Sequence, residues 1–188
     1  MTRIDIDKLA ANVVDTTSML ERDPAAGHVR PNVKTRLLAD VQAQSDFVQY
    51  GKEFSFRCDE ADDRAGRGEA PSPLRHFLSG LAFCQQVWYA KGASLVGIGL
   101  DELEVDVRTY MDMRGEHLID GIAPNPQWIV IEARVASDGT GSQVLEMVDQ
   151  ANARCPVYNL VVKAVPVYER IVHNGEVVGD TIPEGLEA

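Results

Sequence analysis

The sequence predicts an α+β domain in which two core helices pack against antiparallel strands. Alternating apolar and polar residues mark several stretches as half-buried strands, and two stretches with helical spacing of apolar residues lie between them. This order of strands, helix, strands, helix, strands favours antiparallel pairing over repeated strand–helix–strand units. A chain of 188 residues is long enough for one such domain with an extension.

The N-terminal part predicts an amphipathic helix over residues 4–22. Apolar residues recur there near helical spacing, and the Asp-Pro-Ala-Ala-Gly segment at 23–27 ends the pattern. We assign residues 1–32 to an N-terminal helical extension and residues 33–188 to the main domain. Helical periodicity reports packing rather than activity, so this helix is interpreted as a solvated cap or as a helix that packs across the domain or a partner subunit.

Two strands are expected before the first core helix. Residues 34–41 alternate as in a half-buried strand, and a turn is expected near Gln44 to Asp46. Residues 53–58 form the second clear strand, in which Cys58 shares a face with two phenylalanines. Cys58 is therefore interpreted as a small core residue rather than a reactive thiol. The polar stretch 59–71 is expected to be a loop.

The first core helix is expected between Pro71 and Gly92. Ser72 is a good N-cap, Pro73 fits the first helical position, and Gly92 is expected to close the far end. Its apolar stripe contains a cysteine in the middle and comprises Leu74, Phe77, Leu78, Leu81, Cys84, Val87 and Trp88. Apolar residues outside this stripe predict a helix that is covered on several sides.

Further strands and a second helix follow. Residues 102–112 and 127–135 alternate as strands with one wet face. Ser142 is expected to cap the second helix, which ends at Cys155 because Pro156 follows. The chain then continues through an apolar run at 157–167, a hairpin around His173-Asn174-Gly175 and an acidic tail.

Composition excludes several classes of function. A formal net charge of −11 repels polyanions, so neither nucleic acid nor an anionic membrane surface is expected as a partner. Acidic residues near the N-terminus and the absence of a long apolar run predict a cytoplasmic protein without a signal peptide or a membrane span. Four scattered histidines lack metal-ligand spacing, and no phosphate-binding glycine loop is present, so no metal and no cofactor are expected.

Two cysteines stand out as candidates for redox chemistry. If the two core helices pack together, Cys84 and Cys155 lie on core-facing stripes and can form a pair of reactive and resolving thiols. The alternative is that both are packed as small hydrophobes. An attacking Cys84 needs a nearby cation, because apolar surroundings disfavour a thiolate. Arg75 lies about 13 Å of helical rise away and close to half a turn out of phase, so it cannot supply one.

Two motifs resemble those of the OsmC/Ohr family of osmotically inducible and organic hydroperoxide resistance proteins. They are P-S-P-L-R-H-F-L-S-G-L-A-F-C, which ends at Cys84, and A-R-C-P-V-Y-N-L around Cys155. The resemblance covers about residues 33–178. It implies an OsmC-like fold of two central helices wrapped by antiparallel β-sheets in an intertwined homodimer, with active sites at the subunit interface.

The resemblance also implies roles for the two thiols. Cys84 would be the peroxidatic cysteine and Cys155 the resolving one, and a dithiol such as a lipoylated protein would reduce their disulfide. The chain departs from the peroxide-reducing branch at two places. Leu74-Arg75 replaces the glutamate that follows the first proline of the helix, and Gln42 to Asp46 aligns where an arginine follows the first strand. Arg36 is considered as a replacement for that arginine.

The sequence therefore predicts a thiol-dependent reductase of organic hydroperoxides that acts in antioxidant defence. The main alternative is a non-catalytic OsmC-like dimer that binds an apolar ligand or a protein partner, with both cysteines merely packed. A third possibility is a protein that handles the disulfides of other proteins, which would need an exposed thiol.

Overall fold

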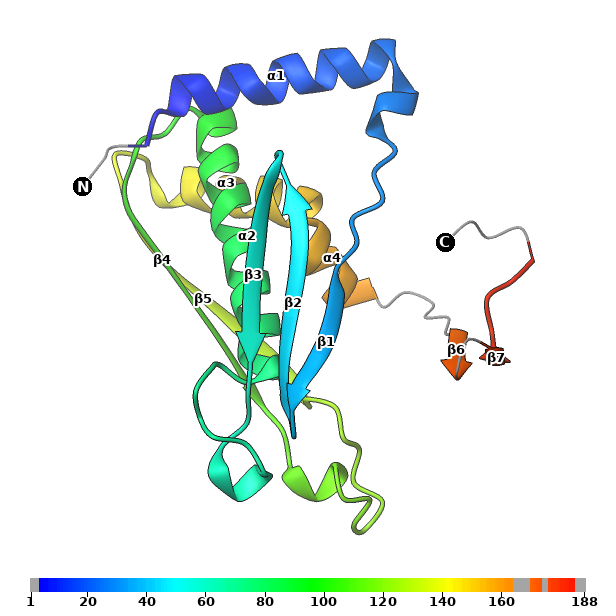
Figure 1. Cartoon of the computed structure of the whole chain (residues 1–188). Helices are drawn as coiled ribbons and strands as arrows, with labels where there is room; N and C mark the ends of the chain where they lie inside the picture. Colours follow the sequence, from blue (N-terminus) through cyan, green and yellow to red (C-terminus); the bar gives the residue numbers. More distant parts are fainter. Residues whose placement is uncertain (1–3, 164–169, 174–175, 185–188) are drawn as a thin grey trace.

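The computed structural model of the chain describes residues 4–163, 170–173 and 176–184. Its elements in chain order are α1 (Ile6–Arg22), the 3-10 turn η1 (Pro24–Gly27), β1 (Lys34–Ala39), β2 (Gln42–Gln49), β3 (Lys52–Cys58), α2 (Pro73–Val96), β4 (Leu100–Tyr110), β5 (Trp128–Ser137), α3 (Gly141–Arg154), α4 (Pro156–Lys163), β6 (Arg170–His173) and β7 (Glu176–Asp180), with short 3-10 turns at Asp62–Arg64 and Met113–Gly115. Within the described residues every strand pair is antiparallel. The predicted α+β class is confirmed (Figure 1).

The core lies where α2, α3 and the β4–β5 pair meet. Its buried residues come from α2, the link to β4, the start of β4, and α3: Tyr89, Ala93, Ile98, Leu100, Met147 and Ala151. Apolar side chains on the inner face of β4 and β5 pack against this cluster, among them Val105 and Val135. Figure 1 shows the long β4–β5 ribbon running beside α2. The alternating patterns of both strands are thus explained by one buried and one wet face.

Helix α2 is longer than the sequence pattern predicts. It continues to Val96, and Gly97 closes it in the left-handed conformation with φ +80°. Gly92 was expected to end the helix, but it is buried within it, where a Cβ would stand 2.6 Å from the Met147 carbonyl oxygen. Gly92 therefore serves the close approach of α2 and α3 rather than the helix end.

One side of α2 is also open to solvent within the single chain. Phe83 is 66% exposed and Val87 is 53% exposed. Helix α2 is covered on several sides as expected, since α1, α3, α4 and β4 all contact it, but the side that carries Phe83 and Val87 is open in the single chain.

Strands β1, β2 and β3 form a sheet in that order. The turn expected at Gln44 to Asp46 is wrong, because β2 runs through these residues, and Ser45 pairs with Thr35 on one side and Phe56 on the other. The chain turns instead after β1, where Asp40 has a φ of +48°. Gln44 and Asp46, which resemble a turn in the sequence, share the polar face of the sheet with Arg36, which binds Asp46.

The second helical region also differs from the expectation. Thr140, not Ser142, caps α3 through a reciprocal capping box with Gln143. Pro156 does end α3, but it also opens α4, since proline fits the first position of a new helix. The apolar run after Cys155 was not expected to be helical, and its residues 164–167 lie outside the described residues. Strands β6 and β7 flank the expected hairpin turn, of which Asn174 and Gly175 lie outside the described part.

Helix α1 lies across one end of α2 (Figure 1). Asp5 caps it by accepting a hydrogen bond from the Lys8 amide at 3.0 Å, and Ile4 packs against the core. The expected N-terminal helix is present, while the division into residues 1–32 and 33–188 stays a prediction. Among the described residues, no helix combines the length and apolar character needed to cross a bilayer.

Candidate functional site

The structure brings Cys84 and Cys155 together. Cys84 lies in the middle of α2 and Cys155 directly follows α3, and their sulfur atoms are 3.0 Å apart. A disulfide bond is about 2.05 Å long, so the pair stands in contact as two free thiols. The close packing of α2 on α3 positions both residues. A small movement of either side chain therefore suffices to form the bond.

Cys155 is held at the junction of two helices. Its amide donates to the Ala151 carbonyl at 2.8 Å, which closes α3, and its carbonyl accepts from the Asn159 amide at 3.0 Å, which opens α4. Its sulfur accepts a hydrogen bond from the Tyr158 amide at 3.4 Å. The Asn159 side chain donates to the carbonyls of Asn152 and Cys155 at 2.8 and 2.9 Å. The backbone around Cys155 is therefore fixed from both sides.

The two thiols differ in burial. Cys155 is fully buried, whereas Cys84 is only half-buried. Burial, and then the hydrogen bond from its thiol to the Cys84 sulfur, raise the pKa of Cys155 to about 11, while the Tyr158 amide opposes this shift. The Tyr158 amide belongs to α4, which the sequence pattern did not predict. At neutral pH Cys155 is thus a protonated, sheltered thiol.

Arg36, the arginine considered as a cation for Cys84, and its neighbour Arg57 bind acceptors on their own sheet. Arg36 pairs with Asp46, and the Arg57 Nε donates to the Gln44 side chain at 3.4 Å. The replacement role considered for Arg36 therefore has no support within the single chain.

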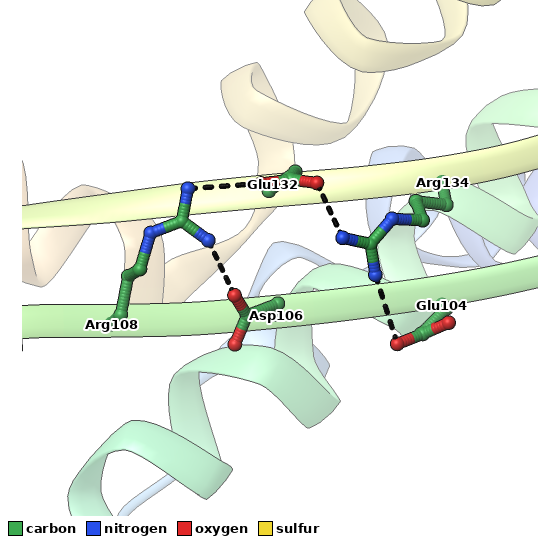
Figure 2. A network of polar contacts seen from close by, with 5 residues as sticks. All are labelled: Glu104, Asp106, Arg108, Glu132 and Arg134. Carbon is green, nitrogen blue, oxygen red and sulfur yellow. Dashed lines mark hydrogen bonds and ion pairs between the residues drawn. The ribbon is translucent and has the colours of Figure 1, made fainter.

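Two further arginines belong to a charged ladder on the outer face of β4 and β5 (Figure 2). Arg108 binds Asp106 and Glu132, and Arg134 binds Glu132 and Glu104. Hydrogen bonds from Arg108, together with the charge of Arg134, lower the pKa of the shared Glu132. Because these groups are largely exposed, we interpret the ladder as a solvated face, not as part of the thiol site.

Sequence reasoning missed a set of amide side chains beside the thiols. Gln85 is fully buried, and its Nε2 donates to the Asn152 Oδ1 at 3.2 Å across α2 and α3. Asn152 and Asn159 flank Cys155 at helical spacing, and Asn159 was noticed only as part of a motif. The sequence does carry a signal for this buried amide, because Gln85 is a polar residue next to Cys84 within a helix expected to lie in the core.

The loop before α2 is built around a buried carboxylate that was also missed. Asp59 accepts hydrogen bonds from the Gln42 side chain at 3.0 Å and from the amides of Glu60, Arg67 and Glu69 at 2.8, 3.2 and 3.1 Å. These bonds, led by that of Gln42, lower the pKa of Asp59. The loop is thereby fixed near the start of α2.

The third cysteine lies apart from the thiol pair. Cys58 is half-buried and lines a pocket of about 280 Å³ between the β1–β3 sheet and the first turn of α2. In the residues that the structure describes, no cluster of three or more His, Cys, Asp or Glu side chains is arranged to hold a metal ion.

Comparison with known proteins assigns the family. The family model for the OsmC-like protein matches residues 66–170, which is more than half of the chain. The chain belongs to the OsmC-like family. The resemblance found in the two cysteine motifs is thereby confirmed. A search of curated protein sequences gives no match.

Solved structures support the OsmC-like fold. An OsmC-like protein from Mycoplasma pneumoniae aligns with a TM-score of 0.59 and 16% identity, covering 72% of this chain and 89% of that protein. A protein from Psychrobacter arcticus, described as an osmotic stress induced and detoxification response protein, gives a TM-score of 0.55 and 18% identity, covering 70% and 88% of the two chains. At these identities the likeness shows the fold alone, and the predicted OsmC-like fold is confirmed.

Proposed function

We propose that this OsmC-like chain is a thiol-dependent reductase of organic hydroperoxides. The observation that carries the proposal is the pair of free thiols whose sulfurs lie 3.0 Å apart with unequal burial. The half-buried Cys84 is the one that a small oxidant can reach, so we assign it as the attacking, peroxidatic thiol. The buried Cys155, with its raised pKa, is a poor nucleophile and is assigned as the resolving thiol.

The proposed reaction proceeds in two steps on the protein. The Cys84 thiolate attacks one oxygen of the hydroperoxide, the O–O bond breaks, and the leaving alkoxide takes a proton to become an alcohol. Cys84 is then a sulfenic acid. The Cys155 sulfur attacks the Cys84 sulfur, the S–O bond breaks, and hydroxide leaves with the thiol proton as water. The product is a Cys84–Cys155 disulfide.

A dithiol closes the proposed cycle. One of its sulfurs attacks the disulfide, its second sulfur releases the enzyme, and the dithiol leaves as a cyclic disulfide while both cysteines regain their protons. A lipoylated protein carries a dithiol of this kind, and the cytoplasm keeps such a pool reduced. The proposal needs no metal and no bound cofactor, and it assigns the protein to antioxidant defence.

A second copy of the chain completes the proposed enzyme. The register of β1 to β3 places Leu37, Phe47, Phe54 and Phe56 on one face of their sheet. Leu37 is 72% exposed and Phe56 is 53% exposed in the single chain. An apolar face of this kind marks a protein interface, and we propose a homodimer in which the partner covers it.

The reaction is tested by counting thiols after oxidation. One equivalent of an organic hydroperoxide should remove two thiols together, and Cys84→Ser should prevent the loss. Cys58→Ser is the matched control and should leave the loss unchanged. An unchanged titration in the wild-type protein would refute the enzyme and favour a non-catalytic dimer that binds an apolar ligand or a protein partner.

A further inference from the structure

Gln85 is a buried amide with an unmet hydrogen bond. The residue is 0% exposed, and its Nε2 donates to Asn152. Its Oε1 has no hydrogen-bond partner among the described residues. A buried acceptor without a donor lowers stability, so a methionine or leucine of similar size would fill this place at less cost.

The amide pair, Gln85 and Asn152, lies beside the thiol pair. Gln85 follows Cys84 on α2, and Asn152 precedes Cys155 by one helical turn. The two helices are therefore joined at neighbouring positions by an amide hydrogen bond of 3.2 Å and a sulfur contact of 3.0 Å. Asn159 extends the arrangement, because its side chain bonds the carbonyls of both Asn152 and Cys155.

A polar contact within an apolar helix interface selects one register. Apolar side chains tolerate small shifts of one helix along another, while an amide pair loses its hydrogen bond when the helices slide. The sulfur contact has the same need for fixed geometry, since a thiol displaced by about 1 Å reacts far more slowly. The amide pair thus specifies an arrangement at a cost in stability.

We propose that Gln85 and Asn152 are positioning residues that hold the Cys84 and Cys155 sulfurs in contact, so that the sulfenic acid on Cys84 is resolved before it is oxidised again. This inference rests on the proposed function. Two reactions compete for the sulfenic acid. Attack by Cys155 gives the disulfide and water, whereas a second hydroperoxide gives a sulfinic acid on Cys84 and an alcohol. The faster of the two reactions decides whether Cys84 returns to the catalytic cycle or is irreversibly oxidised.

The first test measures how well the two sulfurs meet without any peroxide. The full-length protein is equilibrated with mixtures of reduced and oxidised dithiothreitol, and the Cys84–Cys155 disulfide is quantified by mass spectrometry. Gln85→Met should lower the equilibrium constant for disulfide formation roughly tenfold, because the sulfurs lose their fixed geometry. Gln86→Met, at the next position of α2, is the matched control and should behave as wild type.

The second test uses increasing concentrations of cumene hydroperoxide. Gln85→Met should accumulate Cys84 sulfinic acid at roughly tenfold lower peroxide than wild type, without a lower melting temperature. The exchange of Gln85→Asn with Asn152→Gln keeps one amide on each helix and should restore both readouts. Asn152→Leu provides a second variant should Gln85→Met fail to fold.

The outcomes separate the two proposals. If Gln85→Met and Asn152→Leu form the Cys84–Cys155 disulfide with the same equilibrium constant as wild type, the positioning role is overturned, regardless of the result with hydroperoxide. A shifted dithiothreitol equilibrium supports the positioning role even if the hydroperoxide does not oxidise the protein. Absence of oxidation by the hydroperoxide would refute only the proposed function.

Discussion

The carbonyl oxygen of Met147 on α3 lies 2.6 Å from the place where a Cβ on Gly92 of α2 would stand. This contact sets how closely the two helices approach. Both thiols depend on that approach, because Cys84 lies on α2 and Cys155 directly follows α3. The packing of α2 on α3 therefore sets the separation of the Cys84 and Cys155 sulfur atoms.

Gly92→Ala should destabilise the protein and separate the thiols. The added methyl group must push α3 away from α2, which costs about 1–3 kcal/mol of unfolding free energy. Urea denaturation measures this loss, and the disulfide equilibrium with dithiothreitol should fall in parallel. Gly80→Ala is the control, because nothing lies within 4 Å of its Cβ position and alanine favours the helix. A Gly92→Ala protein as stable as wild type would contradict the account of the helix contact.

The raised pKa of Cys155 predicts a loss of stability in alkaline solution. The folded thiol ionises near 11, while an unfolded cysteine ionises near 9.0. Between these values the folded state keeps a proton that the unfolded chain releases, so unfolding becomes easier as the pH rises. The stabilisation is full below about pH 9 and disappears as the pH passes about 11.

Comparison with Cys155→Ala removes the contribution of groups that lie away from Cys155, because these titrate equally in both proteins; Tyr89 and Cys84, which interact with Cys155, form part of the measured effect. The stability difference between the two proteins should shrink by about 1–3 kcal/mol from pH 9 to pH 11 in urea unfolding. A difference that stays constant over this range would show that Cys155 ionises like an exposed thiol.

Asp59 should hold the loop at 59–71 in place. Asp59→Asn replaces an acceptor oxygen by an NH₂ group that faces donors, so the loop should loosen and trypsin should cut faster at Arg64 and Arg67. Asp63→Asn, an exposed position of the same loop, serves as the control. Equal cutting rates in Asp59→Asn and Asp63→Asn would argue against this role of Asp59.

The lowered pKa of Asp59 also makes the folded protein more stable at pH values above the pKa of an aspartate in the unfolded chain. This stability is lost as the pH falls through the pKa of Asp59 in the folded protein.

The sheet face of β1 to β3 should determine the oligomeric state. Phe54→Glu places a charge on the face proposed to meet a second copy, and light scattering should show the mass of a monomer. Val48→Glu places the same charge on the opposite face, where Val48 is already 70% exposed, and should leave the mass unchanged. A wild-type protein of monomeric mass would contradict the proposed dimer directly.

Local patterns in the sequence were enough to predict most of the elements. The alternation in β4 and β5 and the apolar stripe of α2 predicted these elements because one face of each packs against the core. The alternation in β3 predicted a strand as well, although its apolar face is exposed in the single chain. The end of α2 was misplaced because Gly92 looks like a helix end, and only the position of α3 shows that a close contact requires it. The local pattern predicts a turn at Gln44 to Asp46, within β2, because it does not reveal that these polar side chains are paired across neighbouring strands.

The candidate site was predictable to a similar extent. Periodicity put Cys84 and Cys155 on core-facing stripes, and the family motifs singled them out as a pair. The amides of α4 beside Cys155 could not be foreseen, since Pro156 was expected only to end a helix. Gln85 and Asn152 escaped notice because their importance lies in a contact between two helices that are far apart in the sequence.

Mapping the disulfide formed by substrate tests the central claim most directly. The protein is treated with one equivalent of an organic hydroperoxide, digested without reduction, and its peptides are identified by mass spectrometry. The account predicts a single cross-linked peptide that joins Cys84 to Cys155, with Cys58 still free. Peptides that carry Cys84 and Cys155 as unmodified thiols, after the same exposure, would contradict it.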